Sequence, residues 1–437
     1  MNYNSLCENI SVNEQGHLTF AGQDVVILAK EYSTPLYLMD EARIRSNCRV
    51  YTNTLRECFG ENALPLYASK AASFAKMYSI VSEEGFGTDV VSSGELYTAL
   101  LAGIDAKNIF FHSNNKTDAD IAYGIDKGVG HFVVDNVEEL DAINEIALSK
   151  GVRQGVLLRL TPGIDPHTYA AVATGKVDSK FGSAIETGQA KSIAAYALTL
   201  KGIKLEGFHC HVGSQVFDAD VYMRSAEIML SFFKQMKDEY GYETEIFDMG
   251  GGFGVRYVQS DPYIDIAESI RITANFVKAK ALELGIKLPL ICMEPGRSIV
   301  ADAGMTVYTA GTVKKITGYK NYVSIDGSMA DNPRYALYGS KYTVIHAGRA
   351  LDECNFECSL VGRCCESGDI IQENIMLPDG IKRGDVIAVA TTGAYNYSMS
   401  SNYNRLTRPP VVMLSNGTSY VAVKRESLED IVRNDVL

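Results

Sequence analysis

The middle of the chain alternates short apolar segments, rich in strand-forming residues, with longer segments that have helical periodicity. Strands that alternate with helices are typical of a parallel sheet with helical crossovers. Eight such units in roughly 240 residues match the size of a (β/α)8 barrel. We therefore predict an α/β fold built on this barrel, with a doubly wound open sheet as the alternative. The eight apolar segments are residues 64–68, 87–92, 109–113, 131–135, 155–160, 206–212, 245–250 and 290–295.

The helical segments carry their own start and stop signals. Residues 136–150 and 220–240 have apolar side chains spaced three and four apart, which predicts helices. We expect Asn136 and Asp220 to be N-caps, because their side chains can accept hydrogen bonds from the first turn. Gly241 and Gly285 follow helical segments and are expected to end them.

The pattern changes after about residue 303, where short strand-like segments separated by turn residues replace the helical periodicity. The first 35 residues, including "HLTFAGQDVVILAK", have a similar texture. We therefore predict a barrel over residues 36–302 and a mainly β domain, of the sandwich or barrel kind, built from residues 1–35 and 303–437.

Charge and cysteine content exclude several classes of partner and site. The net charge of −12 argues against nucleic acid or an anionic membrane as a partner. No apolar run is long enough to span a membrane, and the first residues do not resemble a signal peptide. Nine scattered cysteines suit a reducing cytoplasm better than a disulfide framework. The spacing of "CNFEC" and "CC" fits no common zinc pattern, so we predict no metal site.

Polar residues fall at the carboxyl ends of nearly all the predicted strands, where a barrel of this kind builds its active site. Any one of them alone is better explained as an ordinary residue at the end of a strand. Their convergence on one face of the barrel favours a functional site. In chain order they are Lys70, Asp89 with Ser92, His112, Asp135, Arg159, His211, the glycines 250–252, and Glu294 with Arg297.

Two segments after the last strands are suited to an anion. "DMGGGFG" (248–254) contains Gly250, Gly251 and Gly252, and glycine lets backbone N–H groups approach a phosphate closely. "EPGRS" (294–298) adds the guanidinium of Arg297, and Ser214 in "HVGSQ" adds a hydroxyl. Barrels often bind phosphate after strands seven and eight.

A lysine, a phosphate site, a carboxylate and a flat side chain together suggest pyridoxal 5′-phosphate (PLP). The amine of Lys70 would condense with the cofactor aldehyde. A carboxylate beside the pyridine nitrogen would keep that nitrogen protonated and the ring electron-poor.

The motifs "YASKAA", "HCHVGSQ", "GGGFG" and "EPGR" resemble those of the PLP-dependent decarboxylase family that acts on ornithine, arginine and diaminopimelate. That family has an alanine-racemase-like barrel and a β domain, and the resemblance covers most of the chain. It implies that Lys70 is the Schiff-base lysine, that His211 stacks on the cofactor ring, and that Glu294 contacts the pyridine nitrogen. The implied phosphate and cofactor contacts are Ser214, Gly250, Gly251, Gly252, Gly296 and Arg297. Asp89 and Arg159 either touch the cofactor or form structural ion pairs.

The β domain carries further motifs of the same family. "DNPRYALYG" (331–339) implies that Arg334 and Tyr338 contact the substrate, and "EPGR" implies that Arg297 binds a substrate carboxylate. "CCESGD" (364–369) implies Cys365 as proton donor and Glu366 as partner of the distal ammonium. "GAYNYSMSSNYN" (393–404) implies that Tyr395 contacts cofactor and substrate.

In this family the Cys–Glu pair enters the active site from a second subunit, which implies a homodimer with shared active sites. We expect Cys364 to lie on the opposite face of a strand from Cys365. Residues 168–182 resemble the family's long loop after strand five. Tyr335 and Ala72 depart from the family pattern without removing a functional group.

The residue types favour one substrate within the family. An arginine and a glutamate together suit a substrate end that carries both a carboxylate and an ammonium. The expected reaction is therefore decarboxylation of meso-2,6-diaminopimelate to L-lysine and CO2, the last step of lysine biosynthesis. Decarboxylation of another basic amino acid is the alternative. A racemase would lack "CESGD", and a non-catalytic PLP carrier would lack the β domain.

Overall fold

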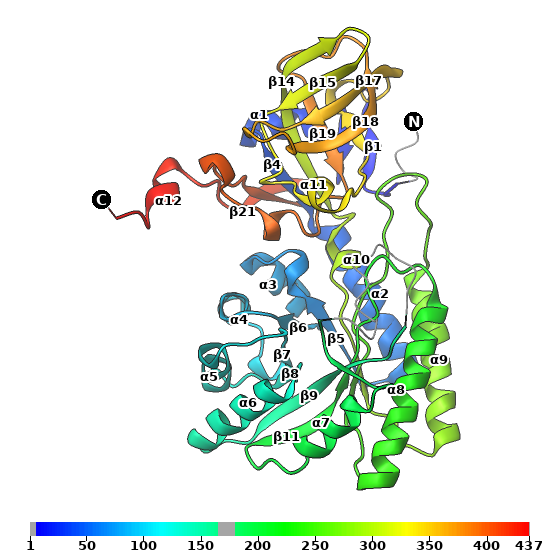
Figure 1. Ribbon diagram of the computed structural model, residues 1–437. Coiled ribbons are helices and arrows are strands. Elements are labelled where there is room, and N and C mark those ends of the chain that lie inside the picture. The colour runs from blue at the N-terminus through cyan, green and yellow to red at the C-terminus, as the bar shows by residue number, and fades with distance from the viewer. Residues whose placement is uncertain (1–5, 165–179, 437) are drawn as a thin grey trace. The chain divides into compact units, whose positions relative to one another are not determined.

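The computed structural model describes residues 6–164 and 180–436. The chain forms two compact units (Figure 1). One comprises residues 47–254 and 263–296, and the other comprises residues 1–46, 255–262 and 297–437. We call them the barrel unit and the β unit. The predicted domain boundaries at residues 36 and 302 stay a prediction.

The barrel unit contains a closed parallel sheet. Each strand pairs in parallel with the next, and β13 pairs with β5 through Met293 opposite Pro65, so the sheet closes on itself. The predicted barrel is thereby confirmed over the open-sheet alternative. Its strands are β5 (Ala63–Ala68), β6 (Gly87–Val90), β7 (Ile109–Phe111), β8 (His131–Val134), β9 (Gln154–Thr161), β11 (Ile203–His209), β12 (Ile246–Asp248) and β13 (Leu290–Met293). The short β10 (Ser183–Ala184) pairs in parallel with the end of β9.

The interior of the barrel is filled by side chains. Six of the strands each contribute one side chain to a buried cluster, made of Leu66, Phe110, Val133, Leu157, Ile246 and Cys292. This packing is expected for a barrel of eight strands, whose interior is a core and not a pore. It leaves the carboxyl ends of the strands as the place for polar side chains.

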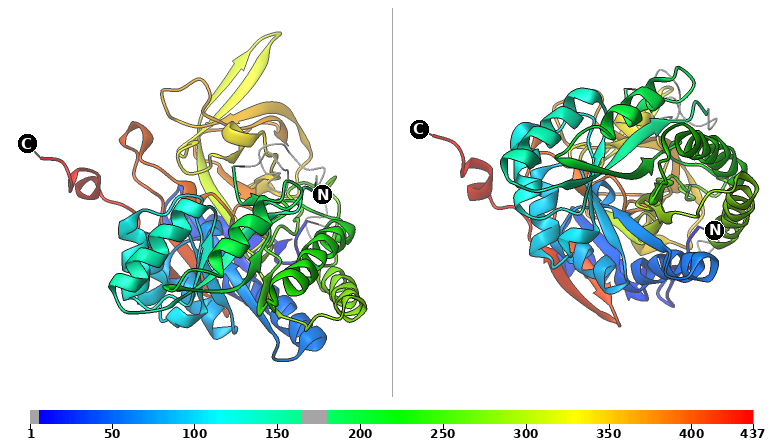
Figure 2. Two further views of the ribbon diagram at one scale, coloured as in Figure 1. Left: turned by 60° about the horizontal axis from the view of Figure 1, so that its bottom comes forward. Right: turned by 90° about the horizontal axis from the view of Figure 1, so that it is seen from below.

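Helices surround the strands (Figure 2). Asn136 caps α6 by accepting from the Glu139 N–H, as predicted. Asp220 was predicted as the cap of α8, but Asp218 is the N-cap and Asp220 lies in the first turn. Apolar periodicity locates a helix face better than its first residue. The helices are α2 (Glu41–Phe59), α3 (Ala75–Glu83), α4 (Ser93–Leu101), α5 (Asp118–Asp126), α6 (Val137–Ser149), α7 (Gln189–Ala197), α8 (Ala219–Tyr240) and α9 (Ile266–Leu284).

Gly241 and Gly285 end α8 and α9 with φ values of 67° and 62°. This left-handed conformation suits glycine, so both predicted stops are confirmed. Among the described helices, none combines the length and apolar character needed to cross a membrane.

The β unit is built from both ends of the chain, as predicted. Strand β4 pairs with β14 on one side and with β20 on the other, so an N-terminal strand lies inside the sheet. The strands are β4 (Leu36–Asp40), β14 (Gly304–Ile316), β15 (Lys320–Ile325), β16 (Val344–His346), β17 (Cys354–Val361), β18 (Ile370–Pro378), β19 (Val386–Ala390), β20 (Val411–Ser415) and β21 (Thr418–Val423). A small separate sheet contains β1 (Ile10–Val12), β2 (Leu18–Phe20) and β3 (Gln23–Asp24).

One N-terminal segment differs from its predicted strand-like texture. Residues "VVILAKEY" form the helix α1 (Val25–Tyr32), capped by Asp24. A short apolar run does not distinguish a strand from a buried helix. The remaining short helices are α10 (Arg297–Val300), α11 (Arg334–Tyr338), α12 (Leu428–Val432), and the 3-10 turns η2 (Ser69–Ala71), η3 (Ala106–Asn108), η5 (Ala347–Arg349), η6 (Tyr397–Met399) and η7 (Tyr403–Arg405).

Candidate active site

Lys70 lies in the 3-10 turn directly after β5, at the carboxyl end of the strand. Its neighbours Ser69 and Ala71 are buried, whereas Lys70 itself is exposed. The N–H of Ser69 donates to Asp89 Oδ1 at 2.9 Å, which fixes the backbone beside the lysine. The turn therefore presents the amine of Lys70 at the end of the barrel where the sequence predicted the site.

Gly296 packs against this strand end. A Cβ atom at Gly296 would lie 2.8 Å from the Cβ of Ala68 and 3.1 Å from that of Ala71. The glycine of "EPGR" is thus required by the close approach of two chain segments. Any contact that it makes with a cofactor comes in addition to this packing role.

Glu294 is buried between two imidazoles. His112 Nε2 lies 2.6 Å from Glu294 Oε1, and His209 Nε2 lies 3.2 Å from Glu294 Oε2. The two imidazole rings meet edge to face at 4.9 Å. Burial lowers the pKa of His112, and it lowers that of His209 to about 4, so both rings are neutral at neutral pH.

The protons of this cluster have a definite arrangement. Burial would raise the pKa of Glu294, but His112 and His209 outweigh it and hold that pKa well below its ordinary value. Burial and the charge of Glu294 raise the pKa of Asp248 well above its ordinary value. The two shifts run in opposite directions, so a proton shared by this pair of carboxyl groups is held on Asp248 rather than on Glu294. These four groups lie within 4.8 Å of one another, which is close enough to hold a cation. In the structure His209 is hydrogen bonded to Glu294, and His112 Nε2 lies against the other carboxylate oxygen.

The glycine run after β12 is shaped by packing. Gly250 and Gly252 have φ values of 66° and 117°, which L side chains rarely adopt. A Cβ atom at Gly251 would lie 2.0 Å from the carbonyl oxygen of Glu294. The N–H of Gly250 donates to Asp248, and that of Gly251 donates to His211 Nδ1 at 3.3 Å.

His211 and Ser214 follow β11, next to this run. Gly213, the neighbour of Ser214, approaches Gly252 closely, since a Cβ atom at Gly252 would lie 2.2 Å from the carbonyl oxygen of Gly213. Burial, with Lys70 and Arg159 nearby, lowers the pKa of His211 well below its ordinary value. A neutral ring of this kind can stack on a flat ligand without adding charge to the site.

Asp89 and Arg159 are both placed by the barrel strands. Burial, reinforced by Glu294, raises the pKa of Asp89 to about 8. Burial lowers the pKa of Arg159, whose guanidinium lies 4.4 Å from the Phe181 ring. Phe181 belongs to the predicted loop 168–182, of which residues 168–179 lie outside the described part of the chain.

A second cluster of predicted residues lies in the β unit. Arg297 and Arg334 are the first residues of α10 and α11, and each is only 5–6% exposed. Arg334 donates to the Tyr342 hydroxyl at 2.9 Å, and the Arg297 guanidinium lies 4.8 Å from the Tyr395 ring. Tyr338, at the end of α11, is 40% exposed. These positively charged groups are suited to bind carboxylates.

Cys365 and Glu366 lie in the connection between β17 and β18, and both are exposed. The N–H of Cys365 donates to Asn404 Oδ1 at 2.7 Å. The predicted placement of Cys364 and Cys365 on opposite faces of a strand is wrong, because both lie in this connection. Turn contacts, including the Cys364 N–H to Asp369 Oδ2 at 2.7 Å, replace strand pairing here.

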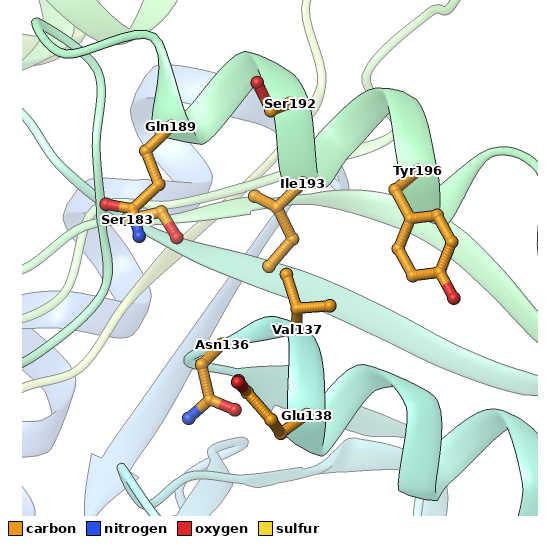
Figure 3. Close-up of a pocket in the computed structure, with 8 residues that line it drawn as sticks. All are labelled: Asn136, Val137, Glu138, Ser183, Gln189, Ser192, Ile193 and Tyr196. Atoms are coloured by element: carbon orange, nitrogen blue, oxygen red, sulfur yellow. The ribbon is translucent and has the colours of Figure 1, made fainter.

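A separate pocket of about 370 Å³ lies between the starts of α6 and α7 (Figure 3). None of the predicted site residues lines it. Its walls are Asn136, Val137, Glu138, Ser183, Gln189, Ser192, Ile193 and Tyr196. It is therefore distinct from the barrel cluster around Lys70 and Glu294.

His209 is a site residue to which the sequence had given no chemical role. It lies on β11, two positions before His211, so alternation along the strand places both on the same face. This alternation indicates that His209 faces the same side as His211, but it does not indicate a partner. The contact of His209 with Glu294 joins residues 85 positions apart. Local spacing does not predict such a pairing.

Comparisons with known proteins agree with the fold and the motifs. Residues 41–301 match the family model of the pyridoxal binding domain of pyridoxal-dependent decarboxylases. The chain is 43% identical to a diaminopimelate decarboxylase of Bacillus methanolicus, covering 95% of this chain and 96% of the relative. It is 41% identical to that of Staphylococcus aureus, covering 98% and 99%.

A solved structure extends the comparison to three dimensions. The structure of a diaminopimelate decarboxylase from M. jannaschii in complex with L-lysine covers 98% of both chains, with 31% identity and a TM-score of 0.88. Sequence and structural similarity extend over both units of the chain. The chain belongs to the pyridoxal-dependent decarboxylases, in the family of the diaminopimelate decarboxylases.

Proposed function

We propose that this protein decarboxylates meso-2,6-diaminopimelate to L-lysine and CO2, with PLP as its cofactor. The observation that carries the proposal is the match over nearly the whole chain to diaminopimelate decarboxylases at about 40% identity. The buried, ionised Glu294 and the exposed Lys70 supply the chemistry that such a cofactor needs.

The barrel residues fit the cofactor. Lys70 offers an amine at a strand end, and Glu294 offers a carboxylate that His112 and His209 orient. When bound, PLP supplies an electron sink for the electrons released as CO2 leaves. We assign the pyridine nitrogen to Glu294 and the ring face to His211. The phosphate and the remaining cofactor contacts are assigned to Ser214, Gly250, Gly251, Gly252, Gly296, Arg297, Asp89, Arg159 and Tyr395.

The β unit supplies the groups that recognise the substrate. Arg297 and Arg334 bind carboxylate, Tyr338 and Tyr395 line the substrate, and Glu366 binds the distal ammonium. Cys365 donates the proton that replaces the lost carboxylate. Exposed thiol and carboxylate side chains are accessible to a second chain, which supports a homodimer in which this pair serves the partner's active site. Nine free cysteines support a reducing compartment, and we propose the cytoplasm.

Decarboxylation of lysine, ornithine or arginine is the second candidate, since these reactions use the same cofactor chemistry. The combination of Arg334 with Glu366 favours diaminopimelate, because the distal end of the simpler substrates has no carboxylate. A buried arginine without an anion to bind would be costly.

The test measures CO2 release from meso-diaminopimelate, L-lysine and L-ornithine, each with and without added PLP. We expect PLP-dependent release from meso-diaminopimelate only. The Lys70→Ala variant is the matched control, and we expect it to lose the PLP absorbance shift together with the activity. Turnover of lysine or ornithine without turnover of diaminopimelate would overturn the assignment.

A further inference from the structure

Tyr257 is a buried tyrosine to which none of the motifs assigns a role. It lies in the segment 255–262, which belongs to the β unit although it directly follows the glycine run in sequence. Its backbone is held at both ends: the N–H donates to Asp261 Oδ2 at 2.8 Å, and the carbonyl accepts from Thr343 Oγ1 at 2.9 Å. The backbone that carries the ring is therefore held by its own segment, through Asp261, and by Thr343 from outside that segment.

Two guanidinium groups meet at this ring. Arg297 Nη1 donates a hydrogen bond to the Tyr257 hydroxyl. The Cζ atoms of Arg297 and Arg334 lie 5.8 Å and 4.9 Å from the ring centroid. Tyr395 contacts Arg297, Tyr342 contacts Arg334, and Tyr257 contacts both arginines.

The charge balance of this cluster points to an anion. Arg334 is buried, and it forms no ion pair with a carboxylate anywhere in the described ranges 6–164 and 180–436. Buried charges are normally paired. Burial would raise the pKa of Tyr257, but the nearby charges of Arg297 and Arg334 outweigh it and lower that pKa.

A carboxylate is the anion that best suits this arrangement. Guanidinium groups bind carboxylates through two parallel hydrogen bonds, and two adjacent guanidiniums repel each other unless a group between them offsets the charge. The Tyr257 hydroxyl accepts from one guanidinium and can donate its own proton to a bound carboxylate.

We propose that Tyr257 is a positioning residue that holds Arg297 and Arg334 as one carboxylate-binding pair, and so sets the affinity for the substrate carboxylate that survives the reaction. This inference rests on the proposed function, because it takes the ligand to be an amino acid whose distal carboxylate remains in the product. It adds to the arginines the residue that fixes their mutual position.

The experiment compares the holoenzyme with its Tyr257→Phe variant, which keeps the ring and removes only the hydroxyl. Two inhibitors are titrated against each: L-lysine, which retains the distal carboxylate, and cadaverine, the diamine left when lysine loses its carboxylate. We expect the affinity for L-lysine to fall about tenfold, the size of one charge-assisted hydrogen bond, and that for cadaverine to change less than about twofold. KM for the substrate should rise more than kcat falls.

Tyr308→Phe is the matched control. Tyr308 is a fully buried tyrosine of the same unit, and its hydroxyl donates to Asp331. This variant should leave the ratio of lysine to cadaverine affinity unchanged even if it lowers stability. If Tyr257→Phe leaves the ratio of lysine to cadaverine affinity unchanged, whether or not both affinities fall, the inference is overturned. A wild-type protein that binds neither ligand would overturn the proposed function itself.

Discussion

His112 Nε2 lies 2.6 Å from Glu294 Oε1, and both side chains are buried at the end of the barrel. His209 contacts the other oxygen of the same carboxylate. Two neutral imidazoles from β11 and from the end of β7 thus hold one carboxylate that follows β13. Because the rings are neutral, they orient Glu294 and favour its ionised form without cancelling its charge.

The contact between His112 and Glu294 predicts a graded response to substitution. His112→Leu removes the ring nitrogen that lies 2.6 Å from Glu294 Oε1, so the pKa of Glu294 should rise and PLP affinity should fall by about tenfold or more. His112→Gln keeps a nitrogen donor near the position of Nε2 and should lose less. The measurement is PLP dissociation followed by absorbance, together with the pH profile of kcat. Equal losses in the Leu and Gln variants would show that the donor is not what matters.

Asp89 predicts a pH dependence of stability in the protein without PLP. Its pKa is raised to about 8 in the folded chain, so between its ordinary value near 4 and pH 8 the folded state binds a proton that the unfolded state does not. Asp89 therefore lowers stability as pH rises through this window, by at most about 1.4 kcal/mol per pH unit. Asp89→Asn keeps an oxygen for the Ser69 N–H and cannot titrate.

The check is the unfolding temperature of both proteins from pH 5 to pH 8, measured at matched ionic strength. The difference between Asp89→Asn and the wild type should grow in favour of the variant as pH rises. Parallel pH profiles for the two proteins would contradict the raised pKa.

Gly251 and Gly241 predict a contrast between two glycine substitutions. A Cβ atom at Gly251 would lie 2.0 Å from a backbone oxygen, whereas the space around Gly241 is open within 4 Å. Gly241→Ala should lower the free energy of unfolding by about 1 kcal/mol, through the positive φ of this residue alone. Gly251→Ala should lower it several times more, because the backbone at Glu294 would have to move away from the new Cβ atom. Denaturant unfolding measures both, and similar losses would refute the close approach.

Cys365 and Lys70 predict complementation between inactive variants. Cys365→Ala and Lys70→Ala should each be inactive alone. If the subunits share active sites, mixing the two variants should restore part of the activity, because a mixed dimer contains one site with both groups intact. The assay is CO2 release after mixing under conditions that allow subunit exchange. Lack of restored activity, with mixed dimers demonstrated by differently tagged subunits, would argue against shared sites.

The fold was predictable where the signal is local. The alternation of apolar and helical segments predicted the strands of the barrel, and short motifs predicted that Lys70, His211 and Glu294 lie at strand ends. The ends of two helices at Gly241 and Gly285 were equally predictable. The predictions were wrong where one local pattern fits two structures. The apolar run that was expected to be strand-like forms the helix Val25–Tyr32, and the N-cap of α8 is Asp218 instead of Asp220.

The sequence by itself determined the periodicities and the identities of the reactive side chains, because strand alternation, helix spacing and tight turns depend on neighbouring residues. Only the tertiary structure decided which of these side chains meet. His209 reaches Glu294 across 85 positions, and Tyr257 reaches Arg297 across 40. Such contacts depend on strand order, barrel closure and the burial of charge, which no local stretch of sequence encodes.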